Sequence, residues 1–296
     1  MICLARQLKK VRRQADRSML AVLKQHKRAL LRIVLLGALA LFLYDGANRV
    51  EITYYDYTGR DLPQSFDGYR IVQLSDLHNA VFPNENEDLI EKVRALEPDL
   101  IVLTGDFIDA STHTDYDDAL LFMQQIPKIA PCYYVFGNHE YRLKKSLRDA
   151  FVGQIEKWGV HYLDNSAVQI ASDAGETLTL IGLNDLSLRS KDLEQLVNAS
   201  EDDFQIVLAH EPAYFSSYAE TGADLVFSGH EHGGQFRIPF THIGVMSHDG
   251  FFTTNAEGMH VQDDTTMIIS RGLGNSVFPF RVFNHPEIVF VTMHSE

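Results

Sequence analysis

The sequence predicts an α/β layered domain that follows a basic and then apolar N-terminal segment. From Tyr69 onward, apolar runs of four to eight residues end in polar or glycine-containing turns, and helical patterns lie between them. Strands that are buried on both faces read as continuous apolar runs, and their alternation with helices is typical of a layered α/β domain. The 296 residues are 45% hydrophobic and 22% charged, so this one domain is large enough to bury a core.

The N-terminal arm, residues 1–32, is strongly basic. It holds ten Lys or Arg against one acid, Asp16, a balance of +9, so a net charge of −14 leaves −23 for the remaining residues. Basic residues beside a membrane are attracted to anionic lipid headgroups. The acidic remainder repels polyanions, which argues against nucleic acid as a partner.

An apolar segment over residues 33–48 follows the arm. Ile33 to Tyr44 carries no charge, although it is shorter than the roughly 20 residues of a comfortable membrane span. The basic flank predicts a cytoplasmic N-terminus. We therefore expect a single-pass anchor in the cell membrane, with residues 49–296 as an extracytoplasmic domain. An interfacial helix and a cleaved signal peptide are the alternatives, and cleavage after Ala40 would leave an unusually short apolar core.

The order of elements in the body follows from the apolar runs. We expect strands at 70–74, 100–104, 132–136, 178–183, 205–209, 225–228, 267–270 and 288–292. We expect helices at 85–96, 116–125, 145–158 and 191–199. The two cysteines, Cys3 and Cys132, fit neither a disulfide nor a paired-cysteine metal site.

Polar residues cluster where five of these strands end. The five blocks read Ser75-Asp-Leu-His78, Thr104-Gly-Asp-Phe-Ile-Asp109, Gly137-Asn-His-Glu140, Ala209-His-Glu-Pro212 and Ser228-Gly-His-Glu-His-Gly-Gly234. Each block alone is more often a tight turn or a buried structural histidine. Ligands of α/β sheets bind at the carboxyl ends of strands, so five such blocks together predict a metal site with oxygen and imidazole ligands.

The five blocks resemble the signature of the calcineurin-like metallophosphoesterases, in the order D-x-H, G-D-x-x-D, G-N-H-[DE], H and G-H-x-H. The rest of residues 50–296 is similar to the family's membrane-associated bacterial branch of YkuE-like and UDP-2,3-diacylglucosamine pyrophosphatase-like enzymes. Three segments carry this likeness: residues 229–235, 270–274 and 284–289. The resemblance implies two mixed β-sheets packed face to face with helices outside.

The resemblance also implies a role for each residue of the blocks. The first metal would take Asp76, His78 and His232, the second would take Asn138, His210 and His230, and Asp106 would bridge both. His139 would protonate the leaving oxygen, and Asp109 and Glu140 would orient the ligands. The implied reaction is hydrolysis of phosphodiester or pyrophosphate bonds by a metal-bridging hydroxide. Two divalent ions (Mn, Zn or Fe) would serve a substrate that is membrane-associated or an envelope precursor.

Two other functions remain open, a broad-specificity phosphomonoesterase and a non-catalytic membrane-anchored scaffold. Substrate contacts are also open. The segment 236–266 could line an apolar groove or form a surface loop, and the residues kept as candidates for substrate contact are His248, His260, Arg237, Arg271 and Arg281.

Overall fold

The computed structural model describes residues 2–109, 116–184, 192–198, 203–247, 250–275 and 278–296. The chain divides into two compact units, Met1–Asp45 and Gly46–Glu296, and we call the second unit the body.

The first unit belongs to a single long helix, α1 (Ile2–Asn48), so the basic arm and the apolar segment share one element. Arg, Lys, Gln, Leu and Ala, which favour helix, make up most of it. Its part from Gln25 to Asn48 is long and apolar enough to cross a membrane. The side chains of Ile33, Leu36 and Leu41 in this part are exposed.

The first sheet of the body has six strands in the order β1-β14-β2-β3-β4-β5. Its strands are β1 (Glu51–Gly59), β2 (Arg70–Leu74), β3 (Leu100–Thr104), β4 (Cys132–Val135), β5 (Val160–Tyr162) and β14 (Glu287–Ser295). Strands β2 to β5 run parallel, and β14 is antiparallel to β2. The first and last strands of the body, β1 and β14, pair in parallel.

The second sheet also has six strands, in the order β12-β13-β9-β8-β7-β6. Its strands are β6 (Ser166–Ala171), β7 (Thr177–Gly182), β8 (Gln205–Leu208), β9 (Leu225–Ser228), β12 (Gly258–Gln262) and β13 (Thr265–Ile269). The central four strands are parallel, and the edge strands β6 and β12 are antiparallel to their neighbours. Both sheets are therefore mixed.

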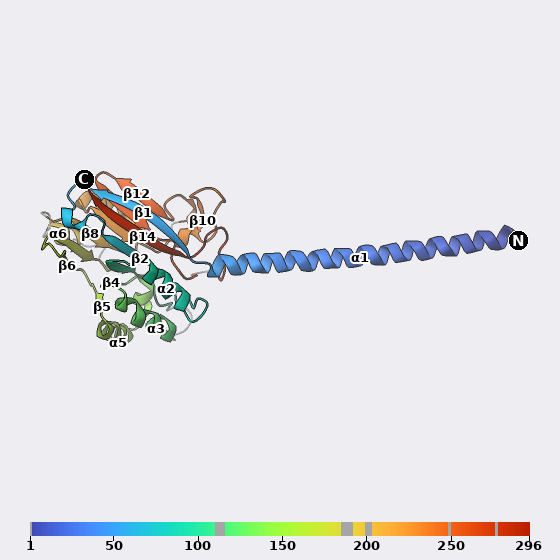
Figure 1. The fold of residues 1–296 in the computed structure, drawn as a ribbon, viewed down its shortest axis with the longest axis horizontal. Coiled ribbons are helices and arrows are strands. Elements are labelled where there is room, and N and C mark those ends of the chain that lie inside the picture. The colour runs from blue at the N-terminus through green and yellow to red at the C-terminus, as the bar shows by residue number, and fades with distance from the viewer. Residues whose placement is uncertain (1, 110–115, 185–191, 199–202, 248–249, 276–277) are drawn as a thin grey trace. The chain divides into compact units, whose positions relative to one another are not determined.

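The two sheets pack face to face through an apolar layer that includes Val102 and Val289 of the first sheet and Ile206 and Phe227 of the second. Helices cover the outer faces: α2 (Glu87–Ala95), α3 (Asp117–Gln125) and α5 (Lys145–Ile155) lie on the first sheet, as Figure 1 shows, and α6 (Asp192–Asn198) and α7 (Phe215–Thr221) lie on the second. This four-layer arrangement confirms the expected fold.

Short elements complete the body. They are α4 (Asn138–Arg142), the two-stranded sheet of β10 (Gly244–Ser247) and β11 (Gly250–Thr253), and the 3₁₀ turns Gln64–Phe66, Ile126–Lys128, Glu156–Trp158, Pro212–Tyr214 and His232–Gly234. The helix expected at 145–158 thus ends as α5 at Ile155 and continues as a 3₁₀ turn.

Candidate metal centre

The carboxyl ends of strands from both sheets meet at one rim. Gln73, near the end of β2, donates to Thr104 Oγ1 of β3 at 2.9 Å and to the Ser228 carbonyl of β9 at 2.7 Å. His210, just after β8, has its Nδ1 2.7 Å from the Thr104 carbonyl oxygen. These contacts join the two sheets, so the loops that follow the strands converge on one place.

One group of buried ligand atoms comes from Asp76, His78 and His232, and these atoms lie within 4.8 Å of one another. The two imidazole Nε2 atoms are 3.0 Å apart, and Nε2 of His232 is 3.5 Å from Asp76 Oδ1. The loop after β2 supplies the first two residues, and the loop after β9 supplies the third. The structure thus brings together the three residues predicted for the first metal.

A second group comes from Asp106, His210 and His230, whose ligand atoms also lie within 4.8 Å of one another. His210 Nε2 is 3.3 Å from Asp106 Oδ2 and 3.1 Å from His230 Nδ1. In one orientation, the Asn138 amide nitrogen donates to Asp106 Oδ2 at 3.0 Å and the amide oxygen accepts from Arg142 at 2.9 Å. The reverse orientation turns its oxygen toward Asp106, as a shared cation would require.

The ligand atoms of the two groups fit a cation because several of them direct lone pairs toward one another, and a cation between them would bind these lone pairs. His210 Nδ1 donates to a backbone carbonyl, so when this ring is neutral its Nε2 points a lone pair at Asp106 and His230. Burial lowers the pKa of His78 to about 4, so a proton on this ring does not supply the missing positive charge. Neutral imidazoles and carboxylates that converge in this way are typical ligands of divalent transition metals.

The charges buried at the centre also favour a bound cation. Burial, offset in part by His210, raises the pKa of Asp76 to about 6. Burial would also raise the pKa of Asp106, but the nearby His210 outweighs it and holds that pKa well below its usual range. Although burial disfavours charge on His210, Asp106 raises the pKa of this ring well above 6.5.

The backbone at the centre is held in an uncommon conformation. Five non-glycine residues of the ligand loops have positive φ, at 53°, 48°, 54°, 73° and 49° for Asp76, His78, Asp106, His230 and His232. Such conformations cost free energy and gather at functional sites. The loops after β9 and β2 also lie very close together at the centre. A Cβ added to Gly229 would overlap Ser75 Oγ and Asp76 Oδ2.

His139 lies beside the two groups, at the start of α4. Its Nε2 is 4.0 Å from Asp106 Oδ2, and its ligand atom shares a 4.8 Å group with His78 and Asp106. Its Nδ1 lies 3.1 Å from Asp109 Oδ1, and the Arg142 guanidinium is 2.9 Å from its Nε2. A guanidinium at Nε2 disfavours a metal there, so this histidine is suited to proton transfer rather than to ligation.

Glu140 holds the ligand loops in place. Its buried carboxylate accepts from the backbone N–H groups of Asp106 (3.0 Å), Ile108 (3.1 Å) and Gly137 (2.9 Å). Burial, together with the charge of Asp106, raises its pKa to about 7. Glu140 thus contacts the backbone of the ligand loops, whereas Asp109 contacts His139, which is not one of the predicted ligands.

The residues kept open for substrate contact are engaged elsewhere. Arg237 pairs with Glu257, and Arg271 pairs with Glu287 at 3.1 Å. Arg281 donates to backbone carbonyls, and one of its nitrogens lies 3.4 Å from His232 Nδ1, behind that ligand. His260 Nε2 contacts the Glu257 carbonyl oxygen at 2.8 Å. His248 lies outside the described residues.

Two residues at the centre were missed in the sequence, Arg142 and Glu211. Glu211 Oε2 is 3.4 Å from His230 Nε2 and can orient that ring. Both carried a local signal. Arg142 follows His139 by three positions, one helical turn, and Glu211 follows His210 directly.

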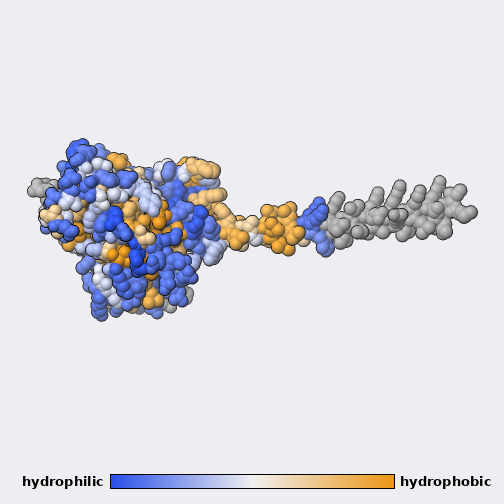
Figure 2. All heavy atoms as spheres, in the orientation of Figure 1, coloured by the Kyte–Doolittle hydropathy of each residue, from blue (hydrophilic) through white to orange (hydrophobic). Residues whose placement is uncertain are grey.

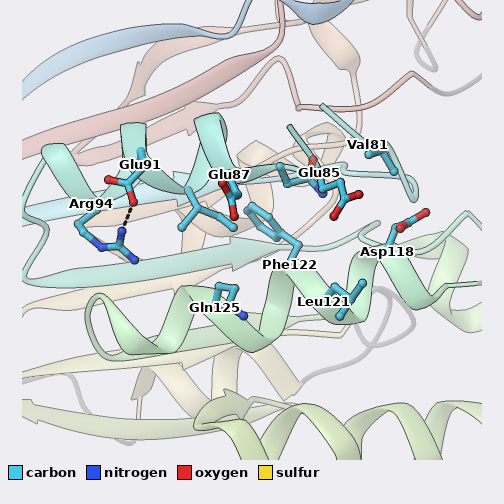
Figure 3. Close-up of a pocket in the computed structure, with 11 residues that line it drawn as sticks. Val81, Glu85, Glu87, Glu91, Arg94, Asp118, Leu121, Phe122 and Gln125 are labelled. Carbon is cyan, nitrogen blue, oxygen red and sulfur yellow. Dashed lines mark hydrogen bonds and ion pairs between the residues drawn. The ribbon is translucent and has the colours of Figure 1, made fainter. Parts of the chain in front are cut away.

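A cavity of about 750 Å³ lies between α2 and α3 (Figure 3). None of the candidate ligands lines it. Four acids, Glu85, Glu87, Glu91 and Asp118, contribute to its walls and would repel a phosphoester.

Comparisons with known proteins match this sequence to a family. Residues 69–234 match the model of the calcineurin-like phosphoesterases. The chain is similar to the metallophosphoesterase YkuE of Bacillus subtilis, with 31% identity over 83% of this chain and 86% of that protein. YkoQ of the same bacterium is 30% identical over 74% of this chain and 82% of its own length.

A vertebrate protein matches as well. The transmembrane protein with metallophosphoesterase domain of Danio rerio is 25% identical over 90% of this chain, which spans 63% of that longer protein. The matched region from residue 69 to 234 includes every candidate metal ligand, from Asp76 to His232. These findings confirm the resemblance: this chain belongs to the calcineurin-like metallophosphoesterase family.

Proposed function

We propose that this protein hydrolyses phosphodiester or pyrophosphate bonds with two divalent cations, and that its substrate is a lipid-linked or envelope precursor at a membrane. The observation that carries the proposal is the pair of buried ligand groups, one around Asp76 and one around His210, with Asp106 contacting both. A metal-dependent phosphoester hydrolase is what the family match supports. Two cations, the bond type and the substrate class go beyond that match.

The cations, when bound, would lower the pKa of a water molecule and neutralise charge that develops on the phosphoryl group. The protein's part begins with the ligands named above, and we assign Asn138 to the second group because its amide reaches Asp106. Asp106 is held by Glu140 through its own backbone N–H, so its carboxylate is fixed between the two groups.

We assign to His139 the protonation of the leaving group. Its Nδ1 faces Asp109, which fixes the ring orientation and stabilises the ring when both nitrogens are protonated. In this structure Nε2 faces the Arg142 guanidinium, which can only donate. Nε2 can therefore protonate the leaving oxygen only after Arg142 has turned away and the ring has taken up a proton there. The exposed Arg142 reaches the same nitrogen, and its planar guanidinium is suited to bind a phosphoryl oxygen once substrate arrives.

We also propose that α1 anchors the protein in the cell membrane, with the body on the extracytoplasmic side. The apolar part of α1 and the basic residues that precede it support this topology. The name of the Danio rerio relative, a transmembrane protein, supports a membrane location. A protease added to intact cells should remove the body, whereas a protected body would contradict the proposed side.

Metal reconstitution tests the reaction. The purified protein is stripped of metal, loaded with Mn, Zn, Fe or Mg, and assayed on bis-p-nitrophenyl phosphate and on p-nitrophenyl phosphate. We expect two metal ions per chain and a metal-restored activity that favours the diester. Preference for the monoester would make the protein a phosphomonoesterase. A loaded protein that is inactive on diesters, monoesters and pyrophosphates would be a scaffold.

A further inference from the structure

We propose that the body carries its own lipid-binding surface, built from Ile238, Phe240, Phe251, Phe252 and Phe283, which we call the aromatic surface. Its partner is the zwitterionic surface of a lipid bilayer. The membrane anchor proposed above supports the choice of this partner, but the binding itself requires neither the anchor nor catalysis.

The aromatic surface is unusually exposed. Phe240 is fully exposed, Phe251 and Phe252 are 72% and 63% exposed, and Phe283 is 51% exposed. Of the nine large hydrophobic residues that are exposed in the described part of the body, five belong to this surface. Figure 2 shows hydrophobic atoms gathered over the loops at β10. Contiguous exposed apolar patches mark interaction sites.

Backbone contacts bring these residues together from two distant parts of the chain. Arg237, next to Ile238, donates its N–H to the Val282 carbonyl at 3.0 Å, which places Phe283 beside the turn that carries Phe240. Arg237 also bridges to Gly244 of β10, and Gly244 pairs with Thr253, the neighbour of Phe252. Ile238, Phe240 and Phe283 line one cavity of about 720 Å³.

Three of the phenylalanines have a backbone conformation that costs free energy. Phe240, Phe252 and Phe283 have φ of 64°, 59° and 54°, a region that bulky residues rarely adopt. Phe240 lies in a closed turn, in which the N–H groups of Ile238 and Thr241 donate to the carbonyls of Ile243 and Ile238, both at 3.2 Å. A strained backbone that presents an aromatic ring to solvent indicates a function for that ring.

A bilayer is the partner that the start of the body indicates. The body begins at Gly46, and a Cβ added there would lie only 2.6 Å from the carbonyl oxygen of Arg281. The candidate span ends at Asn48, so continuity of the chain places any membrane exit within a few residues of Phe283. Aromatic side chains partition well into the interfacial region of a bilayer.

Charge favours neutral rather than anionic lipid. Residues 33–296 carry a balance of −23, because the ten basic residues of the arm lie before them. Attraction to acidic headgroups therefore does not drive binding. The aromatic surface begins six residues after the ligand His232, so a bilayer bound there lies near the loop that completes the metal centre.

Vesicle binding by the body alone tests the proposal. The three apolar clusters of the core extend from Val50 to Met293, and they include no residue from the part of α1 whose side chains are described, so residues 46–296 contain these three clusters in full. We expect this fragment to float with phosphatidylcholine vesicles, and to do so equally at about 0.5 M salt, where exposed charges are screened. The triple variant F240S/F251S/F252S should bind at least tenfold less.

A matched double variant, L121S/V261S, removes two exposed hydrophobic residues outside the aromatic surface and should bind as the parent does. Thermal unfolding checks that each variant is folded. Failure of the parent fragment to bind vesicles, or equal binding by the triple variant, would overturn the proposal. A fragment that dimerises through these phenylalanines in sedimentation velocity, without binding lipid, would identify a second copy as the partner. An inactive fragment that still binds vesicles would count only against the proposed reaction.

Discussion

The metal centre and the aromatic surface depart from the usual distribution of side chains in opposite directions. The centre buries carboxylates and imidazoles: Asp76 is 0% exposed and Asp106 2%. The aromatic surface exposes phenylalanine, and Phe240 is fully exposed. Both regions also hold non-glycine residues at positive φ. Each departure costs free energy, so each indicates a function.

The difference between the regions lies in what offsets the cost. At the centre, opposite charges and backbone donors inside the protein face the buried groups, as Glu140 faces the N–H of Asp106. At the aromatic surface the exposed fractions show that little of Phe240, Phe251 and Phe252 is covered within the described body. The metal centre is therefore suited to bind an ion inside the protein, whereas the aromatic surface is suited to bind a partner outside it.

The largest effect should come from Asp106→Asn, which removes the carboxylate shared by both ligand groups. We expect turnover of bis-p-nitrophenyl phosphate to fall by about a thousandfold or more, together with a loss of bound metal. Metal analysis and steady-state kinetics measure the two effects. Glu156→Gln, in the 3₁₀ turn after α5 and outside the centre, is the control. If Asp106→Asn kept its full metal content and normal turnover, the Asp106 carboxylate would not be a metal ligand.

The next effect concerns His139, which we assign to proton transfer rather than to ligation. His139→Ala should lower kcat by roughly 10²–10⁴-fold while metal content stays unchanged. The exposed His161 stacks on Tyr133 away from the centre, so His161→Ala should leave kcat unchanged. If His139→Ala lost one of the two ions, the group it forms with His78 and Asp106 would instead be a metal site.

Close packing at the centre predicts an effect for Gly229→Ala. The new Cβ would overlap Asp76, so we expect a loss of about 1–3 kcal/mol of unfolding free energy and weaker metal binding. Gly153, in α5, has open space around it, and Gly153→Ala should stabilise the protein by roughly 0.5–1 kcal/mol. Chemical denaturation of both variants measures the contrast, and equal stabilities would show that the two sheets can separate without cost.

A half-buried carboxyl outside both regions, that of Asp224, can be compared with the carboxylates of the metal centre. Burial raises the pKa of Asp224 from 3.8 to about 6. A group whose pKa is higher in the folded state stabilises the fold at low pH, and this contribution is lost as the pH rises from about 4 to about 6. We expect roughly 1–2 kcal/mol, allowing for partial exposure to solvent.

Asp224→Asn should flatten that part of the stability profile, measured by urea denaturation across the pH range. Added metal should leave this contribution unchanged, because Asp224 bonds the N–H of Gln205 and not the centre. A metal-dependent change in the contribution of Asp224 would contradict the separation of this carboxyl from the metal centre.

The smallest effect concerns backbone strain at the aromatic surface. Phe252 has positive φ, whereas its neighbour Phe251 is not among the residues with positive φ. Phe252→Gly should therefore be more stable than Phe252→Ala by about 1 kcal/mol. At Phe251 the order should reverse, with alanine more stable than glycine by about 0.5–1 kcal/mol. If the glycine and alanine variants had the same order of stability at both positions, the backbone at Phe252 would not be strained.

The interior strands and the ligand motifs could be predicted from the sequence. All eight strands expected from apolar runs are interior strands of the two sheets, among them β2 (Arg70–Leu74) and β3 (Leu100–Thr104), whose bounds agree. Interior strands are buried on both faces, so their signal is local and continuous. The resemblance carried by the motifs then placed the ligands, which the structure brings together.

The four edge strands, β1, β5, β6 and β12, were missed, as were β10 and β11. Edge strands are half exposed: β6 alternates intermediate and exposed residues, and it carries no continuous apolar run. Their pairing depends on a neighbour that lies elsewhere in the chain. The parallel pair of β1 and β14, which joins the two ends of the body, has no local signature.

The sequence by itself determined the residue types at the centre, because a ligand's chemistry belongs to its side chain and its place after a strand is a local pattern. Only the tertiary structure decided which atoms face one another, such as Nε2 of His78 against Nε2 of His232. It also decided that the phenylalanines after Phe236 are exposed and that Phe283 joins them. Exposure is set by what packs against a residue from distant parts of the chain, and a local pattern does not contain that information.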